Sequence, residues 1–240
     1  MVTVQPRLEV SGYTSLRIFR YERKFLVDEL EIGQVKSIIN LHPRMFFVTY
    51  PPRFVNNLYL DTHELQNYHD NINGASERRK VRIRWYGQPF GFIQQPILEI
   101  KVKNGLVGTK YDYPLNPFSF NRGFNHRHLL STVKASNLPE NVRQDVCCLS
   151  SALFNRYYRY YYASRDKNYR LTLDSQLTFF KANDIFVNTF VHHQINQRVF
   201  VVELKYEVDQ DQIANNVASY FPFRVTRNSK YVEGVERVYF

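Results

Sequence analysis

The sequence lacks the features that mark membrane, secreted and disulfide-stabilised proteins. None of its apolar stretches approaches the roughly 20 residues that a membrane-spanning helix requires. The N-terminal segment MVTVQPRLEVSGYTSLR has no apolar core, so no secretory signal is expected. The only cysteines, Cys147 and Cys148, are neighbours and provide no ordinary disulfide to hold a fold together. We therefore expect a cytoplasmic protein in a reducing compartment, without a membrane segment.

Glycine-rich nucleotide-binding signatures are missing as well. The sequence contains only 9 glycines in 240 residues, and they form neither a P-loop nor a Rossmann fingerprint. A nucleotide would therefore have to be held through its phosphate groups.

What the chain has in excess is positive charge. It carries 32 Lys and Arg against 22 Asp and Glu, which gives a formal charge of +10. This balance favours a polyanionic partner, and composition alone leaves open nucleic acid, anionic lipid or a small phosphate ester. Because 44% of the residues are hydrophobic, global disorder is excluded. The positions of the basic side chains in a folded domain must decide among these partners.

Most of the chain favours β-structure. Segments rich in β-branched and aromatic residues predict strands over residues 17–26, 54–60, 80–86, 96–103, 108–113, 157–163, 168–173, 185–191, 198–206 and 223–227. Helical spacing predicts helices over residues 28–41, 62–68, 140–154 and 210–220, and residues 50–52 and 71–74 resemble loops. We predict a single mainly β domain over residues 1–240, an antiparallel barrel or sandwich with helices packed outside.

Five of these strands combine a charged face with a mostly apolar one, because alternate side chains of a strand share a face. In VRIRW, Arg82 and Arg84 lie opposite Val81, Ile83 and Trp85. The same alternation groups Arg20 with Glu22 and Lys24, Glu99 with Lys101 and Lys103, Arg170 with Thr172 and Asp174, and Glu203 with Lys205.

Two interpretations fit these charged faces. In the first, the apolar faces form an ordinary core and the charged faces point into water. In the second, the charged faces line a wide barrel and the apolar faces lie outside, beneath helices. A lumen of Arg and Lys with a few carboxylates would suit a chain of phosphates and its divalent metal. Alternation alone leaves both interpretations open.

The order of several motifs resembles a known family. RYERKFLV, NNLYLDT, KVRIRWYG, ILEIKVK, YYRYYY, YRLTLD, VVELKY and NSKYVEGV follow one another as in the VTC domain. This is the polyphosphate polymerase domain of the vacuolar transporter chaperone complex and its bacterial relatives, within the triphosphate tunnel metalloenzyme or CYTH-like superfamily. The resemblance covers residues 17–235 and implies an eight-stranded antiparallel β-barrel that encloses a tunnel.

The resemblance also implies roles for individual residues. Those expected to neutralise and position the triphosphate are Arg82, Arg84, Lys101, Arg159 and Arg170. Further contacts to substrate or product are expected from Lys24, Lys110, Tyr157, Ser229 and Lys230. Glu203 resembles the glutamate that coordinates Mn²⁺ or Mg²⁺, and Glu22 is a second candidate ligand.

Departures from the superfamily pattern bear on the reaction. Hydrolytic members carry Glu-x-Glu-x-Lys on the first strand, whereas this chain has Arg20-x-Glu22-x-Lys24, and Lys205 follows Glu203 where a second late carboxylate is common. Fewer carboxylates favour the polymerase branch, with ATP as donor and inorganic phosphate or pyrophosphate as first acceptor. The alternatives are a metal-dependent tripolyphosphatase or nucleoside triphosphatase, and a non-catalytic module that binds polyphosphate or inositol phosphates. The basic run SERRKVRIR leads into Arg82 and Arg84, so no nucleic-acid partner is expected.

Overall fold

The computed structural model describes residues 20–104, 107–182, 193–194, 199–207 and 210–240. Its main sheet is antiparallel, with the strand order β1-β11-β9-β8-β2-β3-β5-β6. These strands are β1 (Arg20–Val27), β2 (Phe47–Asp61), β3 (Glu77–Tyr86), β5 (Ile97–Asn104), β6 (Val107–Pro114), β8 (Ser150–Ala163), β9 (Tyr169–Lys181) and β11 (Phe200–Glu207). The short β10 (His193–Gln194) pairs with β9, and β4 (Gly91–Ile93) pairs with β7 (Phe118–Phe120) in a separate small sheet.

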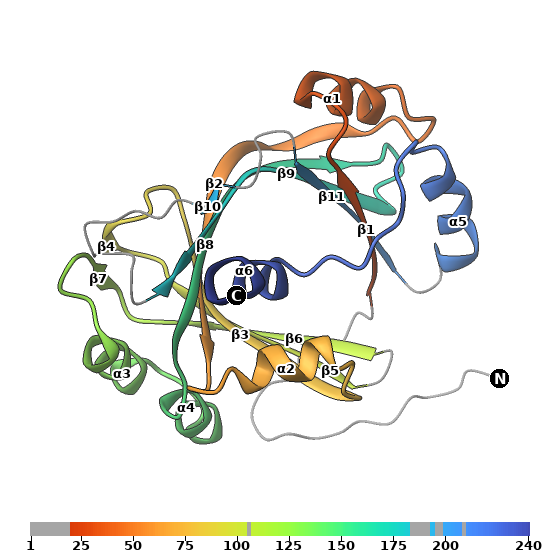
Figure 1. Cartoon of the computed structure of the whole chain (residues 1–240). Coiled ribbons are helices and arrows are strands. Elements are labelled where there is room, and N and C mark those ends of the chain that lie inside the picture. The colour runs from red at the N-terminus through yellow and green to blue at the C-terminus, as the bar shows by residue number, and fades with distance from the viewer. Residues whose placement is uncertain (1–19, 105–106, 183–192, 195–198, 208–209) are drawn as a thin grey trace.

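The main sheet curls around an interior (Figure 1). This architecture confirms the predicted mainly β class and its eight antiparallel strands. The end strands β1 and β6 are not hydrogen-bonded to each other in the described part of the chain, so the sheet is not closed as a barrel. A side-chain contact nevertheless spans the two ends of the sheet, because the Lys101 amine on β5 lies 3.5 Å from a carboxylate oxygen of Glu22 on β1.

The apolar faces of the strands lie on the outside of the curl, beneath helices. One outer layer consists of α3 (His126–Ala135), α4 (Glu140–Cys147) and the small β4–β7 sheet, which cover β3 and β5. There Val81, Ile83 and Trp85 are buried against Leu129 and Val133. The other layer consists of α1 (Ile32–Asn40) and α5 (Asp211–Ser219), which cover β1, β9 and β11. Since this burial accounts for the apolar faces, the charged faces line the concave side of the sheet.

The C-terminal helix α6 (Lys230–Tyr239) packs on the concave side, unlike α1, α3, α4 and α5 (Figure 1). Tyr231 stacks on Tyr59 of β2 with ring centroids 4.9 Å apart, and its hydroxyl donates to Asp61. Gly234 lies so close to β8 and β9 that a Cβ atom there would come within 2.5 Å of Leu153 and Phe179 side-chain atoms. The prediction that helices pack outside therefore fails for α6, which fills part of the interior.

Two local predictions are wrong for identifiable reasons. The predicted helix over residues 140–154 ends at Cys147, and β8 begins at Ser150. Leu153 and Phe154 belong to clusters on opposite faces of the sheet, and a strand buried on both faces has no polar alternation to distinguish it from a helix. The predicted loop over residues 50–52 lies inside β2, where Pro51 and Pro52 fall at a register shift in the pairing with β8. Such irregularities accommodate proline in a sheet.

Other predicted segments differ from the structure in position or length, and some helices of the structure were not predicted. The helix predicted over residues 62–68 is α2 (Gln66–Ile72), and the strand predicted over residues 223–227 is only an isolated bridge between Val225 and Phe25. The helices α3 and α6 were not predicted. The strand predicted over residues 185–191 lies outside the described residues. In the described part, no helix is long and apolar enough to cross a membrane.

Candidate active site

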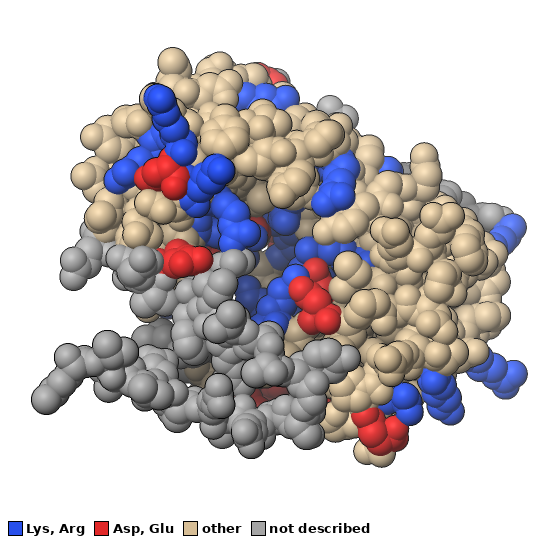
Figure 2. Space-filling model, turned by 180° about the vertical axis from the view of Figure 1, so that it is seen from behind, with Lys and Arg blue, Asp and Glu red and all other residues tan. Residues whose placement is uncertain are grey.

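Charged side chains from seven strands and α6 meet on the concave face, and Figure 2 shows Lys and Arg side chains gathered around a hollow in the molecule. Most of them form ion pairs in one of two groups. The Glu203 group consists of Glu22, Lys24, Arg159, Asp174, Glu203, Lys205 and Lys230. The Glu99 group consists of Arg82, Arg84, Glu99, Lys110 and Asp112.

The centre of the Glu203 group is a pair of buried carboxylates on adjacent strands. Asp174 is fully buried and Glu203 is 5% exposed. Lys230, at the start of α6, places its amine 2.7 Å from Asp174 and 3.2 Å from Glu203. Arg159 donates to both oxygens of Asp174, at 2.6 and 2.7 Å, and lies 3.5 Å from Glu203. Two cations, one from the sheet and one from α6, therefore hold both carboxylates.

Lysines of β1 and β11 complete the surroundings of Glu203. The amines of Lys205 and Lys24 lie 3.1 and 3.7 Å from its carboxylate. Burial opposes ionisation, but the neighbouring Lys230, Lys205 and Lys24 hold the pKa of the Glu203 carboxyl well below its ordinary value. Glu203 is therefore an ionised oxygen donor at neutral pH.

Glu22 is a second ionised carboxylate of this group. Its oxygens lie 3.1 Å from the amine of Lys24 and 3.5 Å from that of Lys101. Burial and the charge of Glu203 both act to raise the pKa of Glu22, but the lysines outweigh them and set it at about 2. The amine of Lys24 contacts both Glu22 and Glu203, so the two carboxylates share a cation.

The Glu99 group is built across three neighbouring strands. Glu99 of β5 is 5% exposed and accepts hydrogen bonds from Arg82 at 2.7 Å and from Arg84 at 3.2 Å. Lys110 of β6 lies 2.9 Å from the same carboxylate. Although burial opposes ionisation, these three cations hold the pKa of Glu99 well below its ordinary value. Glu99 thus fixes the two guanidinium groups in the absence of a ligand.

Tyr157 of β8 lies between the two groups. Its hydroxyl accepts a hydrogen bond from Arg84 at 3.2 Å. Its ring centroid lies 5.0 Å from the guanidinium carbon of Arg159 and 5.1 Å from the amine of Lys230, both within range of a cation–π interaction. Tyr157 therefore links the cations of the two groups into one surface.

The structure brings most of the predicted site residues together. Those on the concave face, in or beside the two groups, are Glu22, Lys24, Arg82, Arg84, Lys101, Lys110, Tyr157, Arg159, Glu203 and Lys230. Arg170 lies opposite Lys205 in the β9–β11 register and is exposed. Ser229 is the N-cap of α6, where its hydroxyl accepts from the backbone amide of Val232.

Residues without a predicted site role also belong to this surface, among them Asp174, Glu99 and Lys80. Asp174 and Glu99 fall on the charged faces that alternation identified, but nothing in the sequence shows that Asp174 organises two cations and Glu99 three. Lys80 shares a face with Arg82, because the two are two residues apart on β3. Its amine donates to the Ser229 hydroxyl at 2.8 Å. Extending the alternation of this charged face to the position two residues before Arg82 identifies Lys80 from the sequence.

The carboxylates of the Glu203 group suit a divalent cation only in part. Glu203 and Glu22 offer ionised oxygens, which Mg²⁺ and Mn²⁺ prefer. Across the described ranges, however, no three His, Cys, Asp or Glu side chains are placed to hold a metal ion by themselves. Mg²⁺ is commonly bound by one or two carboxylates together with substrate phosphates. Glu203 and Glu22 therefore fit a divalent cation that substrate phosphates also help to bind.

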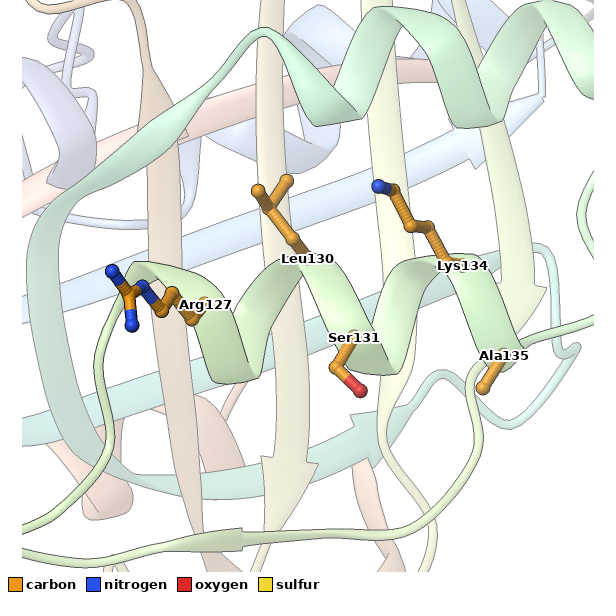
Figure 3. A pocket seen from close by; sticks show the side chains of 5 residues that line it. All are labelled: Arg127, Leu130, Ser131, Lys134 and Ala135. Carbon is orange, nitrogen blue, oxygen red and sulfur yellow. The ribbon is translucent and has the colours of Figure 1, made fainter.

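A separate hollow lies along α3, outside the sheet (Figure 3). It is lined by Arg127, Leu130, Ser131, Lys134 and Ala135, all from this one helix. No carboxylate and no second element contributes to its lining. We therefore place the candidate site on the concave face.

Comparisons with known proteins identify a family and a shared fold. The chain matches the family model of the VTC domain over residues 19–239. Its fold is similar to that of a protein from Hippeastrum, described as an adenylyl cyclase candidate with a dominant triphosphatase activity. The TM-score is 0.52 at 12% identity, covering 91% of this chain and 97% of that one. At that identity the likeness concerns the fold alone.

Two bacterial structures described as adenylate cyclase candidates are less similar. The one from Vibrio parahaemolyticus has a TM-score of 0.48 at 12% identity, with 91% of this chain and 98% of that chain covered. The one from Bacillus halodurans also has a TM-score of 0.48 at 12% identity, with coverages of 88% and 95%. No curated protein sequence matches the chain significantly.

Proposed function

Because the chain belongs to the VTC domain family, we propose that it is a polyphosphate polymerase that transfers the γ-phosphoryl group of ATP onto a growing polyphosphate chain. Family membership and the shared fold support a function on polyphosphate or triphosphate more broadly. The observation that carries the proposal is the concentration of cations on the concave face. Buried or partly buried Arg and Lys side chains outnumber the carboxylates there, and a confined excess of positive charge favours a polyanion.

Phosphoryl transfer mainly requires that the protein position the reacting groups and neutralise the charge of the phosphates, with little covalent participation by the protein. Arg82 and Arg84 suit this task because their fork-shaped guanidinium groups are already oriented by Glu99. Phosphate oxygens would compete with that carboxylate for the same donors. The Glu99 group would therefore bind the triphosphate without large side-chain movements.

Cations of the Glu203 group would hold the other part of the substrate or the product. Arg159 and Lys230 contact the buried carboxylates and flank Tyr157, so they face the same space as Arg84. Lys24 and Lys101, both paired with Glu22, would bind phosphate from the open ends of the sheet. Arg170 and Ser229 would contribute at the margins of this surface.

A divalent cation is part of the proposal. Glu203, with Glu22 assisting, would hold Mn²⁺ or Mg²⁺ together with phosphate oxygens. Such an ion neutralises negative charge on the phosphates when it is bound. Lys205 and Lys24 keep both carboxylates ionised and therefore ready to bind a metal.

A tripolyphosphatase or nucleoside triphosphatase is the second candidate function. It would use the same surface with water as the acceptor, and the triphosphatase activity described for the Hippeastrum protein favours it. The replacement of an early carboxylate by Arg20 and of a late one by Lys205 favours the polymerase, because both changes remove metal ligands. A binding module without activity would keep the cations but would not need a metal.

Incubation with ATP and Mn²⁺, followed by polyphosphate staining on a gel, tests the proposal. A polymerase produces long chains, a hydrolase produces orthophosphate, and a binding module produces neither. Lys101→Glu should abolish chain formation, because it places an anion opposite the phosphates in a poorly screened space. Lys134→Glu on α3 is the matched control and should leave activity unchanged, because Lys134 is exposed on the outside of the sheet. Long chains formed equally by both variants would contradict the placement of the site.

A further inference from the structure

Lys80 differs from the other lysines of the concave face in its partners. It lies opposite Lys101 in the β3–β5 register, and Lys101 in turn lies opposite Lys110 of β6. Its amine donates to the Ser229 hydroxyl at 2.8 Å and, within the described residues, makes no salt bridge. Arg82, two residues later on the same face, is paired with Glu99. Lys80 is therefore a partly buried amine whose polar partner is a neutral hydroxyl.

The charged groups around Lys80 are mainly cations. Lys24 faces it from β1 and Lys101 from β5, while Arg78 and Arg82 flank it on β3. Burial, followed by repulsion from these four side chains, lowers the pKa of Lys80 from 10.5 to about 7. The amine is thus partly unprotonated near neutral pH.

Carboxylates on the adjoining elements are bonded to other groups. Asp61, at the end of β2, accepts from the Tyr231 hydroxyl and from the backbone amides of Asn67 and Tyr68. Glu233 of α6 accepts from Asn228 and Arg237. Glu22 of β1 pairs with Lys24 and Lys101. None of these three carboxylates forms a salt bridge with Lys80, so an incoming anion would be the group that stabilises its charged form.

We propose that Lys80 is a phosphate-binding residue that takes up a proton when a phosphate group enters the space between β3, β5 and the start of α6. This inference rests on the proposed function, because it assumes that phosphates bind on the concave face. The proton comes from the solvent and converts the neutral amine to an ammonium group, which pairs with a phosphate oxygen. Ser229, which shares the amine with that phosphate, positions the side chain.

The consequence is a coupling between phosphate binding and pH. An anion beside Lys80 raises its pKa, so binding draws in a proton wherever the free amine is neutral. The contribution of Lys80 to affinity should then be constant at pH values below about 7 and fall by up to about tenfold per pH unit above it, which is the limit for one coupled proton. Replacement by arginine, whose guanidinium stays protonated, should remove the coupling but preserve binding.

Titration calorimetry with tripolyphosphate at pH 8 measures this coupling directly. The number of protons taken up follows from repeating the titration in buffers of different ionisation enthalpy. At that pH the phosphates are mostly ionised, and their own contribution to the proton uptake is the same for each variant and cancels. We expect the wild-type protein to take up about one more proton per bound tripolyphosphate than Lys80→Arg. Lys134→Arg on α3 should match the wild type.

The outcomes separate this inference from the proposed function. Tight binding with equal proton uptake by the wild type and Lys80→Arg would overturn the role of Lys80 but leave the phosphate site intact. Failure of the folded wild-type protein to bind tripolyphosphate would overturn both. Lys80→Met provides a second test, because it should bind more weakly than the wild type at pH 6 and approach it at pH 9. Circular dichroism verifies that each variant is folded.

Discussion

Glu203 and Glu99 each hold several cations on the concave face, yet their surroundings are assembled differently. The partners of Glu99 come from β3 and from β6, the strands on either side of β5. Glu203 shares its cations with the fully buried Asp174, and Lys230 reaches both carboxylates from α6, a helix distant in sequence from both strands. One group is thus fixed by strand pairing and the other by docking of the C-terminal helix.

On the proposed function, this difference suits the two groups to separate tasks. The Glu99 group presents two guanidinium groups on one carboxylate, which suits the binding of phosphate oxygens. The Glu203 group contains several ionised carboxylates in contact with lysines, which suits a metal ion shared with phosphate. Both keep charged side chains ordered before any ligand arrives, and preorganised charges are the main contribution that a protein makes to phosphoryl transfer.

Glu203→Gln should have the largest effect. If Glu203 holds the metal, turnover should fall by about 10³-fold or more, because charge stabilisation in the transition state is lost. Binding of triphosphate should remain, since the cations are intact, but should no longer strengthen with Mn²⁺. Titration calorimetry with and without Mn²⁺ measures the affinity for triphosphate and its response to the metal.

Glu99→Gln is the matched comparison. It should reduce activity less and preserve the response of binding to Mn²⁺, because Glu99 orients arginines and is not assigned to the metal. The same loss of the Mn²⁺ response in both variants would show that the two groups do not have separate tasks.

Arg82→Ala and Arg84→Ala should each lower activity by about 10²-fold, the scale for losing one well-placed electrostatic stabiliser. They should differ in stability. Arg84 is 7% exposed and bonded to Asn57, Glu99 and Tyr157, so its loss leaves buried polar groups unpaired at a cost of about 1–3 kcal/mol. The Arg82 side chain is 24% exposed, and its loss should cost less. Urea unfolding provides the comparison, and unfolding of both variants with normal activity in the folded fraction would contradict a role in binding.

Gly234→Ala tests whether docking of α6 maintains the Glu203 group. The added Cβ would lie 2.5 Å from side-chain atoms of Leu153 and Phe179, so overpacking should cost about 1–3 kcal/mol of unfolding free energy. Gly33→Ala in α1 is the control, because an added Cβ there would have no neighbouring atom within 4 Å and alanine favours helix. Thermal melts should show destabilisation for Gly234→Ala alone. A neutral Gly234→Ala would contradict the close packing of α6.

Acid should weaken the fold through the ionised carboxylates. The folded pKa of Glu22 is about 2 against an ordinary value of 4.5, so its contribution to stability is fully present above about 4.5 and is lost as the pH falls toward 2. Glu203 and Glu99 shift in the same direction. Urea unfolding between pH 5 and pH 3 should show a smaller loss for Glu22→Gln than for the wild type. Glu140→Gln, at an exposed pair on α4, should behave like the wild type, and an equal effect of both variants would contradict the assignment.

Strand alternation and pairing explain the assembly of the Glu99 group better than that of the Glu203 group, although the family resemblance named most residues of the Glu203 group. Alternation places Arg82, Arg84 and Glu99 on charged faces of two strands, and pairing of those strands is enough to bring them together. The position of Lys230 depends on α6 entering the concave side. That packing is set by Gly234 and Tyr231, whose neighbours in space lie far away in the sequence.

The direction of the charged faces could not be derived from alternation alone. An apolar face at Val81, Ile83 and Trp85 fits both an inner core and an outer layer beneath helices. The family resemblance favoured the second, and burial of these residues against α3 confirms it. The open junction between β1 and β6 and the continuation of β2 through Pro51 and Pro52 depend on long-range pairing, which residue patterns do not encode.

The most direct test of the central claim is a crystal structure of the protein with tripolyphosphate and Mn²⁺. The phosphates should lie on the concave face, in contact with Arg82 and Arg84 on one side and with Arg159 or Lys230 on the other. Tripolyphosphate bound on the outside of the sheet, for example in the hollow along α3, with these cations still paired with Glu99, Asp174 and Glu203, would contradict the account.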